Sequence, residues 1–181
     1  MTNAELAILS LIAEKDRHGY EIESLIEERG MREWTEIGFS SIYYLLKKLE
    51  KKKWIKGKRV RQVGPGRTRV VYHISAAGRK ALRASTLEAL SVPHRASSPM
   101  QLGLANLPAI SKDEALAALC QQREGLVEHR ERIQTRWDSQ QPLPFFVDAM
   151  FDLALTKITA ELDWLDRFID QVEQTHDENR F

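Results

Sequence analysis

The chain has 181 residues, 43% of them hydrophobic, which is enough for one or two domains with a buried core and excludes an intrinsically disordered chain. Its single cysteine excludes an intramolecular disulfide and is typical of a protein in a reducing compartment. Residues 1–90 contain 18 of the 27 basic residues and 11 of the 26 acidic residues, so this half is basic and the remainder is acidic. We therefore expect the basic half, and not the acidic half, to bind a polyanion.

Two helices are predicted in the first 30 residues. Asn3 is placed to cap a helix over residues 3–14, which is apolar on most sides, as is typical of a helix lying between other elements. A second helix follows the break at residues 15–19, with Ile22 on its buried side. Gly30 is placed to end this helix in a left-handed turn.

The third predicted helix is the most informative element of the chain. Ser40 is placed to cap it, and it runs to about Lys53. Its apolar residues recur at i, i+3, i+4 and i+7 and define one buried stripe of Ile42, Leu45, Leu46 and Leu49. The residues left to face away from the core are Ser41, Tyr43, Tyr44, Lys47, Lys48 and Lys51. Hydroxyls and cations gathered on one helix face favour contacts with phosphate oxygens and base edges, whereas an ordinary solvated face mixes both signs of charge.

A basic hairpin is predicted next. Two β-branched runs, residues 55–63 and 68–75, flank the turn at residues 64–66. From Lys47 to Arg69 the chain has eleven Lys or Arg residues and one acidic residue, Glu50. Ser75 is then placed to cap a fourth helix over residues 76–90.

This order of elements, three helices, two strands and a helix, is that of the winged helix-turn-helix, whose third helix enters the major groove of DNA. The predicted fold class is therefore mainly α with a small β-hairpin. The charge pattern and the element order together indicate a DNA-binding domain over residues 1–90.

Residues 91–110 are rich in Pro, Ser and small residues and mark a linker, within which Met100, Leu102, Leu104 and Leu107 suggest a short apolar helix. Residues 111–181 form the third predicted region, a C-terminal helical dimerisation domain. Ser111 and Glu114 have capping-box spacing and begin a helix that runs to Ser139.

The last helix, from about Phe145 to Gln174, carries a heptad pattern that we call the seam. The seam consists of Phe151, Leu155, Ile158, Leu162, Leu165, Ile169 and Val172. A second stripe flanks it, formed by Met150, Leu153, Trp164 and Phe168. Because one partner helix cannot cover so wide an apolar surface, we expect a dimer interface here. The alternative is a monomeric helical hairpin folded on the winged helix.

Three linked motifs follow one another in the N-terminal half. They are His18-Gly19-Tyr20-Glu21-Ile22, then Ser40-Ser41-Ile42-Tyr43-Tyr44, then Gly66-Arg67-Thr68-Arg69 leading to Tyr72, Ile74, Ser75 and Gly78. Through these motifs the N-terminal half resembles the PadR-like family of transcriptional regulators. Ser40 and Tyr44 depart from the family's usual Gly and Pro, which bears on base preference and not on DNA binding. The long C-terminal region looks like the larger subfamily, in which two helices build a homodimer.

The resemblance implies a set of DNA contacts. Tyr43 matches the family tyrosine that contacts the DNA backbone, although packing under the wing is an alternative role. The arginines at the wing tip are expected at phosphates or in the minor groove. The expected DNA-binding residues are Ser40, Ser41, Tyr43, Tyr44, Lys47, Lys48, Arg67 and Arg69.

The larger subfamily also includes repressors released by phenolic acids, which implies an effector pocket where the winged helix meets the C-terminal helices. Tyr20, Met100, Trp137 and Trp164 are candidates to line it, the alternative being that they are core residues. We expect no cofactor, because the five histidines and one cysteine show no metal-ligand spacing. We expect no enzymatic activity, because the chain has no phosphate-binding glycine loop or catalytic motif.

The expected function is that of a homodimeric repressor on a pseudo-palindromic operator, with recognition helices in major grooves about 34 Å apart. An activator, or a DNA-binding factor without an effector, is an open alternative. A winged-helix protein-interaction module that does not bind DNA is another. We expect a cytoplasmic protein without a membrane segment, because no charged region precedes a long apolar run at the N-terminus.

Overall fold

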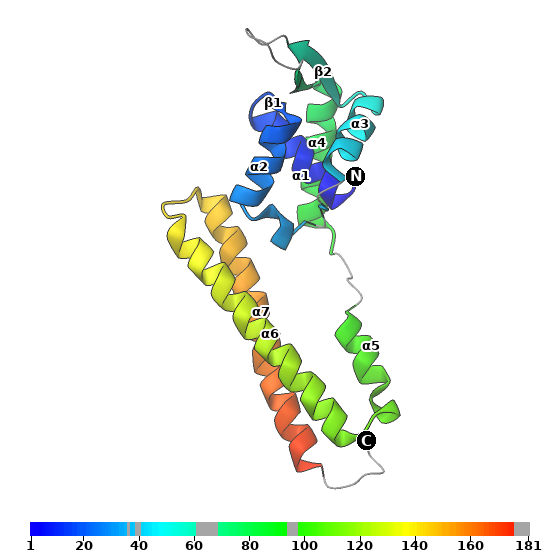
Figure 1. Cartoon of the computed structure of the whole chain (residues 1–181), viewed down its shortest axis with the longest axis vertical. Helices are drawn as coiled ribbons and strands as arrows, with labels where there is room; N and C mark the ends of the chain where they lie inside the picture. Colours follow the sequence, from blue (N-terminus) through cyan, green and yellow to red (C-terminus); the bar gives the residue numbers. More distant parts are fainter. Residues whose placement is uncertain (36, 39–40, 61–68, 94–97, 176–181) are drawn as a thin grey trace. The chain divides into compact units, whose positions relative to one another are not determined.

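The computed structural model describes residues 1–35, 37–38, 41–60, 69–93 and 98–175, which form two compact units, Met1–Arg95 and Ala96–Phe181. The first unit contains α1 (Asn3–Glu14), β1 (Arg17–His18), α2 (Gly19–Glu28), η1 (Met31–Glu33), α3 (Ile42–Lys51), β2 (Ile55–Val60), β3 (Arg69–Ile74) and α4 (Ala76–Ser91). The second contains α5 (Pro99–Ala105), η3 (Leu107–Ala109), α6 (Lys112–Ser139) and α7 (Phe145–Gln174) (Figure 1). The fold is mainly α with a small antiparallel sheet, as predicted.

Helix α1 is capped by Thr2, not by Asn3 as predicted. Thr2 has extended backbone angles, and its hydroxyl accepts a hydrogen bond from the Glu5 amide at 3.2 Å. The Glu5 carboxylate accepts in return from the Thr2 amide at 3.0 Å. The capping box decides the boundary, because its carboxylate lies three residues after Thr2 and two after Asn3.

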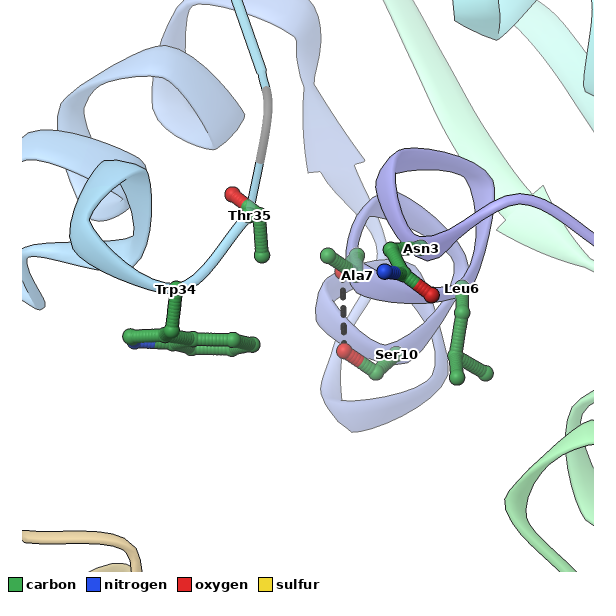
Figure 2. A pocket seen from close by; sticks show the side chains of 6 residues that line it. All are labelled: Asn3, Leu6, Ala7, Ser10, Trp34 and Thr35. Carbon is green, nitrogen blue, oxygen red and sulfur yellow. Dashed lines mark hydrogen bonds between the residues drawn. The ribbon is translucent and has the colours of Figure 1, made fainter. Parts of the chain in front are cut away.

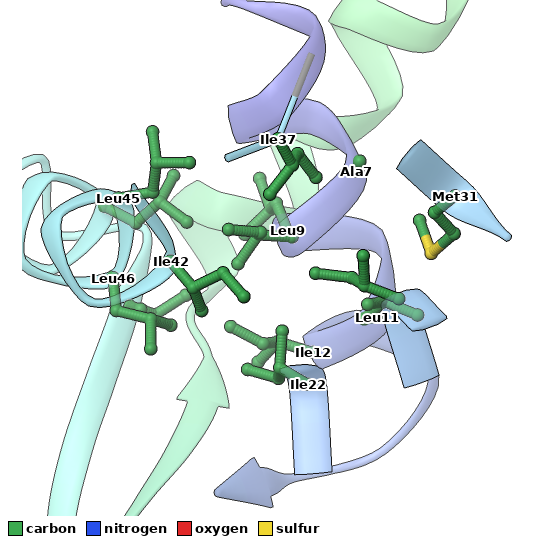
Figure 3. Packing of buried hydrophobic residues seen from close by; sticks show 14 residues of the cluster. Ala7, Leu9, Leu11, Ile12, Ile22, Met31, Ile37, Ile42, Leu45 and Leu46 are labelled. Atoms are coloured by element: carbon green, nitrogen blue, oxygen red, sulfur yellow. The ribbon is translucent and has the colours of Figure 1, made fainter. Parts of the chain in front are cut away.

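The core of the first unit is built around α1, as its all-round apolar pattern predicted. Ile8, Leu9, Leu11 and Ile12 are at most 1% exposed. Figure 3 shows Leu9 of α1 beside Ile42 and Leu45 of α3. All four residues of the predicted α3 stripe are buried. The burial of this stripe fixes which face of α3 remains exposed.

Helix α3 ends in a Schellman turn. The Lys53 amide donates to the Glu50 carbonyl at 2.8 Å, and the Trp54 amide donates to the Leu49 carbonyl at 3.0 Å. Lys53 takes the left-handed conformation, with φ of 60°, that such a turn requires. The chain therefore reverses sharply from α3 into β2 and leaves the wing attached to the end of the exposed helix. Gly30, which also takes a left-handed conformation, follows α2 as predicted.

The sheet has the strand order β1-β3-β2 and is antiparallel throughout. The predicted hairpin corresponds to β2 and β3, and β1 is an additional strand that the sequence did not reveal. In β1, Arg17 pairs with Tyr72 and His18 pairs with Val71. Two residues are too short for an alternating pattern to be read.

Helix α4 lies so close to the start of the wing that only glycine fits at one position. Ser75 caps α4, its hydroxyl accepting from the Gly78 amide at 3.0 Å, as predicted. A Cβ added at Gly78 would overlap the Trp54 carbonyl, which itself accepts a hydrogen bond from the Ser75 amide at 2.9 Å. The glycine and the cap together hold α4 against the strand β2.

In the second unit, α6 and α7 run side by side (Figure 1). The predicted capping box of Ser111 and Glu114 begins α6. Two clusters join the helices, one around Leu119 and Leu165 and the other around Ile133 and Leu162. The seam of α7 thus packs on α6 of the same chain.

Candidate nucleic-acid interface

The exposed face of α3 carries hydroxyl and cationic groups. At about 100° per residue, Tyr44, Lys47 and Lys51 lie opposite the buried stripe, and all three are exposed. Tyr43 lies to one side of this centre, and Lys48 and Lys52 lie to the other. Hydrogen-bond donors to phosphate therefore fill the middle of the face, where a DNA groove would be met.

The phenol ring of Tyr43 rests on the start of α2 and remains 54% exposed. A Cβ added at Gly19 would come within 2.9 Å of the Tyr43 ring, so this glycine makes room for it. With more than half of its surface exposed, Tyr43 is not one of the buried residues. Tyr44 is 65% exposed. Ser41 is half-buried at the N-cap position of α3, where its hydroxyl donates to the Gly38 carbonyl at 2.6 Å.

Two lysines of α3 lie against a carboxylate that the sequence did not single out. The Lys48 and Lys52 ammonium groups lie 3.1 and 2.7 Å from Oε1 of Glu5, whose side chain is 1% exposed. Burial raises the pKa of Glu5, but hydrogen bonds from Lys52, Thr2 and Lys48 outweigh this effect and lower the pKa from 4.5 to about 2. Glu5 is therefore ionised at neutral pH, and Lys48, predicted on the DNA face, is drawn toward α1.

The wing adds an exposed basic strand. In β2, every residue after Ile55 is exposed, including Lys56, Lys58 and Arg59. The strand forms one edge of the sheet. These three residues were absent from the predicted contacts, although Lys56 and Lys58 alternate along the strand within a basic run. Of the predicted wing arginines, Arg69 is exposed and Arg67 lies outside the described residues, as does Ser40.

The wing is tied to α3 through a carboxylate. The Gly57 amide of β2 donates to the Glu50 carboxylate of α3 at 2.9 Å. Tyr72 lies nearby on β3, where burial, together with the negative charge of Glu50, raises the pKa of its hydroxyl. Glu50, the one acidic residue between Lys47 and Arg69, thus positions the wing relative to α3.

Residues 8–84, which include α3, β2 and β3, match the model of the transcriptional regulator PadR-like family. The chain carries a PadR-like transcriptional regulator domain. The family is one of regulators and not of enzymes. No curated protein gives a significant match to the chain.

Solved structures extend the likeness beyond the PadR-like domain. Bacillus subtilis PadR in complex with operator DNA has a TM-score of 0.75 and 21% identity, covering 93% of this chain and 98% of that one. The same protein in complex with p-coumaric acid has a TM-score of 0.76 and 20% identity, covering 94% and 98%. The smu.1604c protein of Streptococcus mutans has a TM-score of 0.70 and 22% identity, covering 94% and 99%. At these identities the likeness establishes a shared fold.

Outside the PadR-like domain, the seam residues are already partly or wholly covered by α6. Ile158, Leu162, Leu165 and Val172 are at most 8% exposed, and Phe151, Leu155 and Ile169 are half-buried. The flanking stripe is more open, with Met150, Leu153 and Trp164 between 37% and 54% exposed. If a second copy binds α7, this stripe offers it more apolar surface than the seam does.

The predicted effector residues belong to both units, and those of the second unit do not all lie together. Tyr20, in the PadR-like domain, is 71% exposed on α2. Within the second unit, Met100 packs on the Leu119 cluster, whereas Trp137 stacks on Phe151 at the other end of α6. Trp164 stacks on Phe168 of its own helix. Eighteen residues separate Leu119 from Trp137, or about 27 Å along a helix, so Met100 and Trp137 do not line one pocket.

One hollow in the described residues lies beside Trp34, and another lies beside Met100. Figure 2 shows one of about 230 Å³ beside Trp34, lined also by Asn3, Leu6, Ala7, Ser10 and Thr35. The Ser10 hydroxyl donates to the Ala7 carbonyl at 2.8 Å, so its proton is already used. The second is a groove of about 620 Å³ lined by Met100 and Leu104 on one side and Leu119 and Leu126 on the other. Only the groove has a volume typical of small-molecule sites.

The described residues show neither a metal-binding cluster nor a membrane-spanning helix. In the described ranges, no three His, Cys, Asp or Glu residues are grouped to hold an ion. No helix in those ranges is long and apolar enough to cross a bilayer.

Proposed function

We propose that the protein is a homodimeric transcriptional repressor that binds a pseudo-palindromic operator. The observation that carries this proposal is the exposed α3 face of Tyr43, Tyr44 and Lys47 beside the basic strand β2. A helix in the major groove and a wing beside it would place these groups at successive phosphates. The proposed contacts are Ser40, Ser41, Tyr43, Tyr44, Lys47, Lys51, Lys56, Lys58, Arg59, Arg67 and Arg69.

The dimer is part of the proposal because two domains related by a twofold axis read two half-sites. The exposed stripe of Met150, Leu153 and Trp164 on α7 supports it. This stripe lies beside the covered seam on α7. A helix of a second copy that packs there would bury the exposed stripe together with its own apolar residues.

Release by a small aromatic acid completes the proposal. It is supported by the likeness to Bacillus subtilis PadR, whose structure has been solved with operator DNA and with p-coumaric acid. The groove beside Met100 is the described hollow with the volume for such a ligand. We therefore place the effector in this groove, which of the four residues predicted from the sequence includes Met100.

The test is a gel-shift titration of the full chain with the DNA upstream of its own gene and with an unrelated duplex of equal length. We expect tighter binding to the upstream DNA, and dissociation of that complex when p-coumaric acid is added. Equal, weak binding to both duplexes would contradict the repressor, and the alternative of a protein-interaction module would then be preferred. An upstream complex that resists p-coumaric acid would reject the phenolic effector alone.

A further inference from the structure

The buried Glu5 carboxylate has no part in the function proposed above, yet it touches the recognition helix. Its side chain is 1% exposed although it is ionised. A buried charge is costly unless it is paired and hydrogen-bonded. Here both oxygens are used, Oε2 by the Thr2 amide at 3.0 Å and Oε1 by the two lysines of α3.

The two lysines are spaced to meet one carboxylate. Lys48 and Lys52 are four residues apart, so they project from the same side of α3. The Lys52 ammonium group also lies 4.5 Å from the centre of the Trp54 ring, which gives it a second favourable contact although its side chain is 35% exposed. Lys47 and Lys51 have the same spacing but lie on the exposed side, and no ion pair is found for either among the described residues.

We propose that Glu5 is a positioning residue for DNA recognition, which fixes α3 against α1 and holds the ammonium groups of Lys48 and Lys52 out of the phosphate contacts. The inference rests on the proposed role of α3 as the recognition helix. In this arrangement, α3 presents Lys47 and Lys51 to DNA while two further cations are neutralised from within the protein. The number of sequence-independent phosphate contacts is thereby limited, which favours selectivity.

Glutamine is the informative replacement at position 5. Glu5→Gln removes the negative charge but keeps an acceptor for the Thr2 amide, because glutamine also serves in a capping box. Lys48 and Lys52 are then released. If each reaches a phosphate, the slope of log affinity against log salt for a random-sequence duplex should steepen by up to about 1.8.

The experiment measures that slope by fluorescence anisotropy with the full chain and a labelled random-sequence duplex between about 50 and 200 mM salt. Lys47→Gln and Lys48→Gln are a matched pair, identical in chemistry and adjacent on α3. Lys47→Gln should flatten the slope by up to about 0.9, and Lys48→Gln should leave it unchanged. The variant that combines Glu5→Gln, Lys48→Gln and Lys52→Gln should return to the slope of the unchanged chain.

An equal flattening by Lys48→Gln and Lys47→Gln would overturn the inference, as would an unchanged or shallower slope for Glu5→Gln. The lysine pair decides the matter even if Glu5→Gln does not fold. If Lys47→Gln also leaves the slope unchanged, the proposed use of α3 on DNA fails instead. Thr2→Ala is the control for stability, because it weakens the cap of α1 but keeps the Glu5 charge.

Discussion

Single residues account for how the wing is held beside α3. Gly78 is the clearest case, because its place in the family motif follows from a steric need that this structure displays. The Trp54 carbonyl occupies the space that a Cβ would take, and a backbone atom cannot move aside as a flexible side chain can. Glycine is required at position 78 because α4 passes close to the Trp54 carbonyl, immediately before β2 begins.

Gly78→Ala should lower the free energy of unfolding by about 1–3 kcal/mol or more, because α4 or β2 must shift. Gly125, on the exposed side of α6, provides the matched control, because no atom lies within 4 Å of the place that a Cβ would take there. Gly125→Ala should raise stability by about 0.5–1 kcal/mol, since alanine favours the helix. Urea unfolding followed by circular dichroism measures both, and equal effects of the two substitutions would contradict the steric account.

At the scale of elements, the heptad pattern of α7 predicted apolar packing but not its partner. A sequence gives the spacing of Leu162 and Leu165, and this spacing is equally compatible with a helix of the same chain or of a second copy. In the structure α6 is that partner, and both leucines are at most 4% exposed. What remains available to a second copy is the flanking stripe, for example Leu153, which is 54% exposed.

We predict a dimer in solution that depends on this stripe. Leu153→Asp should weaken the dimer while the helical content is kept, because the residue is not part of the α6–α7 core. The dimer is tested by sedimentation velocity at tens of micromolar protein, and a monomer for the unchanged chain would refute it.

Leu165→Ala should instead cost about 2–5 kcal/mol of unfolding free energy, because it opens a cavity between the helices. Urea unfolding measures this loss of stability.

For the whole molecule, the elements with long patterns could be predicted, and the contacts that join them could not. The stripe from Ile42 to Leu49 predicted α3 and its exposed face, and the capping box at Ser111 predicted the start of α6. Strand β1 could not be predicted because two residues show no periodic pattern. The ion pairs of Glu5 could not be predicted because its partners are 43 and 47 positions away in the sequence. The predicted effector residues share an aromatic or thioether side chain, and this property does not determine which of them lie together.

The account as a whole depends on α3 meeting DNA. The most direct measurement is the affinity for the upstream DNA of a variant with Tyr43→Phe and Lys47→Gln, together with its melting temperature. Both side chains are exposed and lie off the buried stripe, so the melting temperature should hardly change. Losing the tyrosine hydroxyl alone should cost about 0.5–1.5 kcal/mol of binding free energy, and losing the lysine should add to it and flatten the salt slope. Unchanged affinity with unchanged stability would show that α3 does not contact DNA.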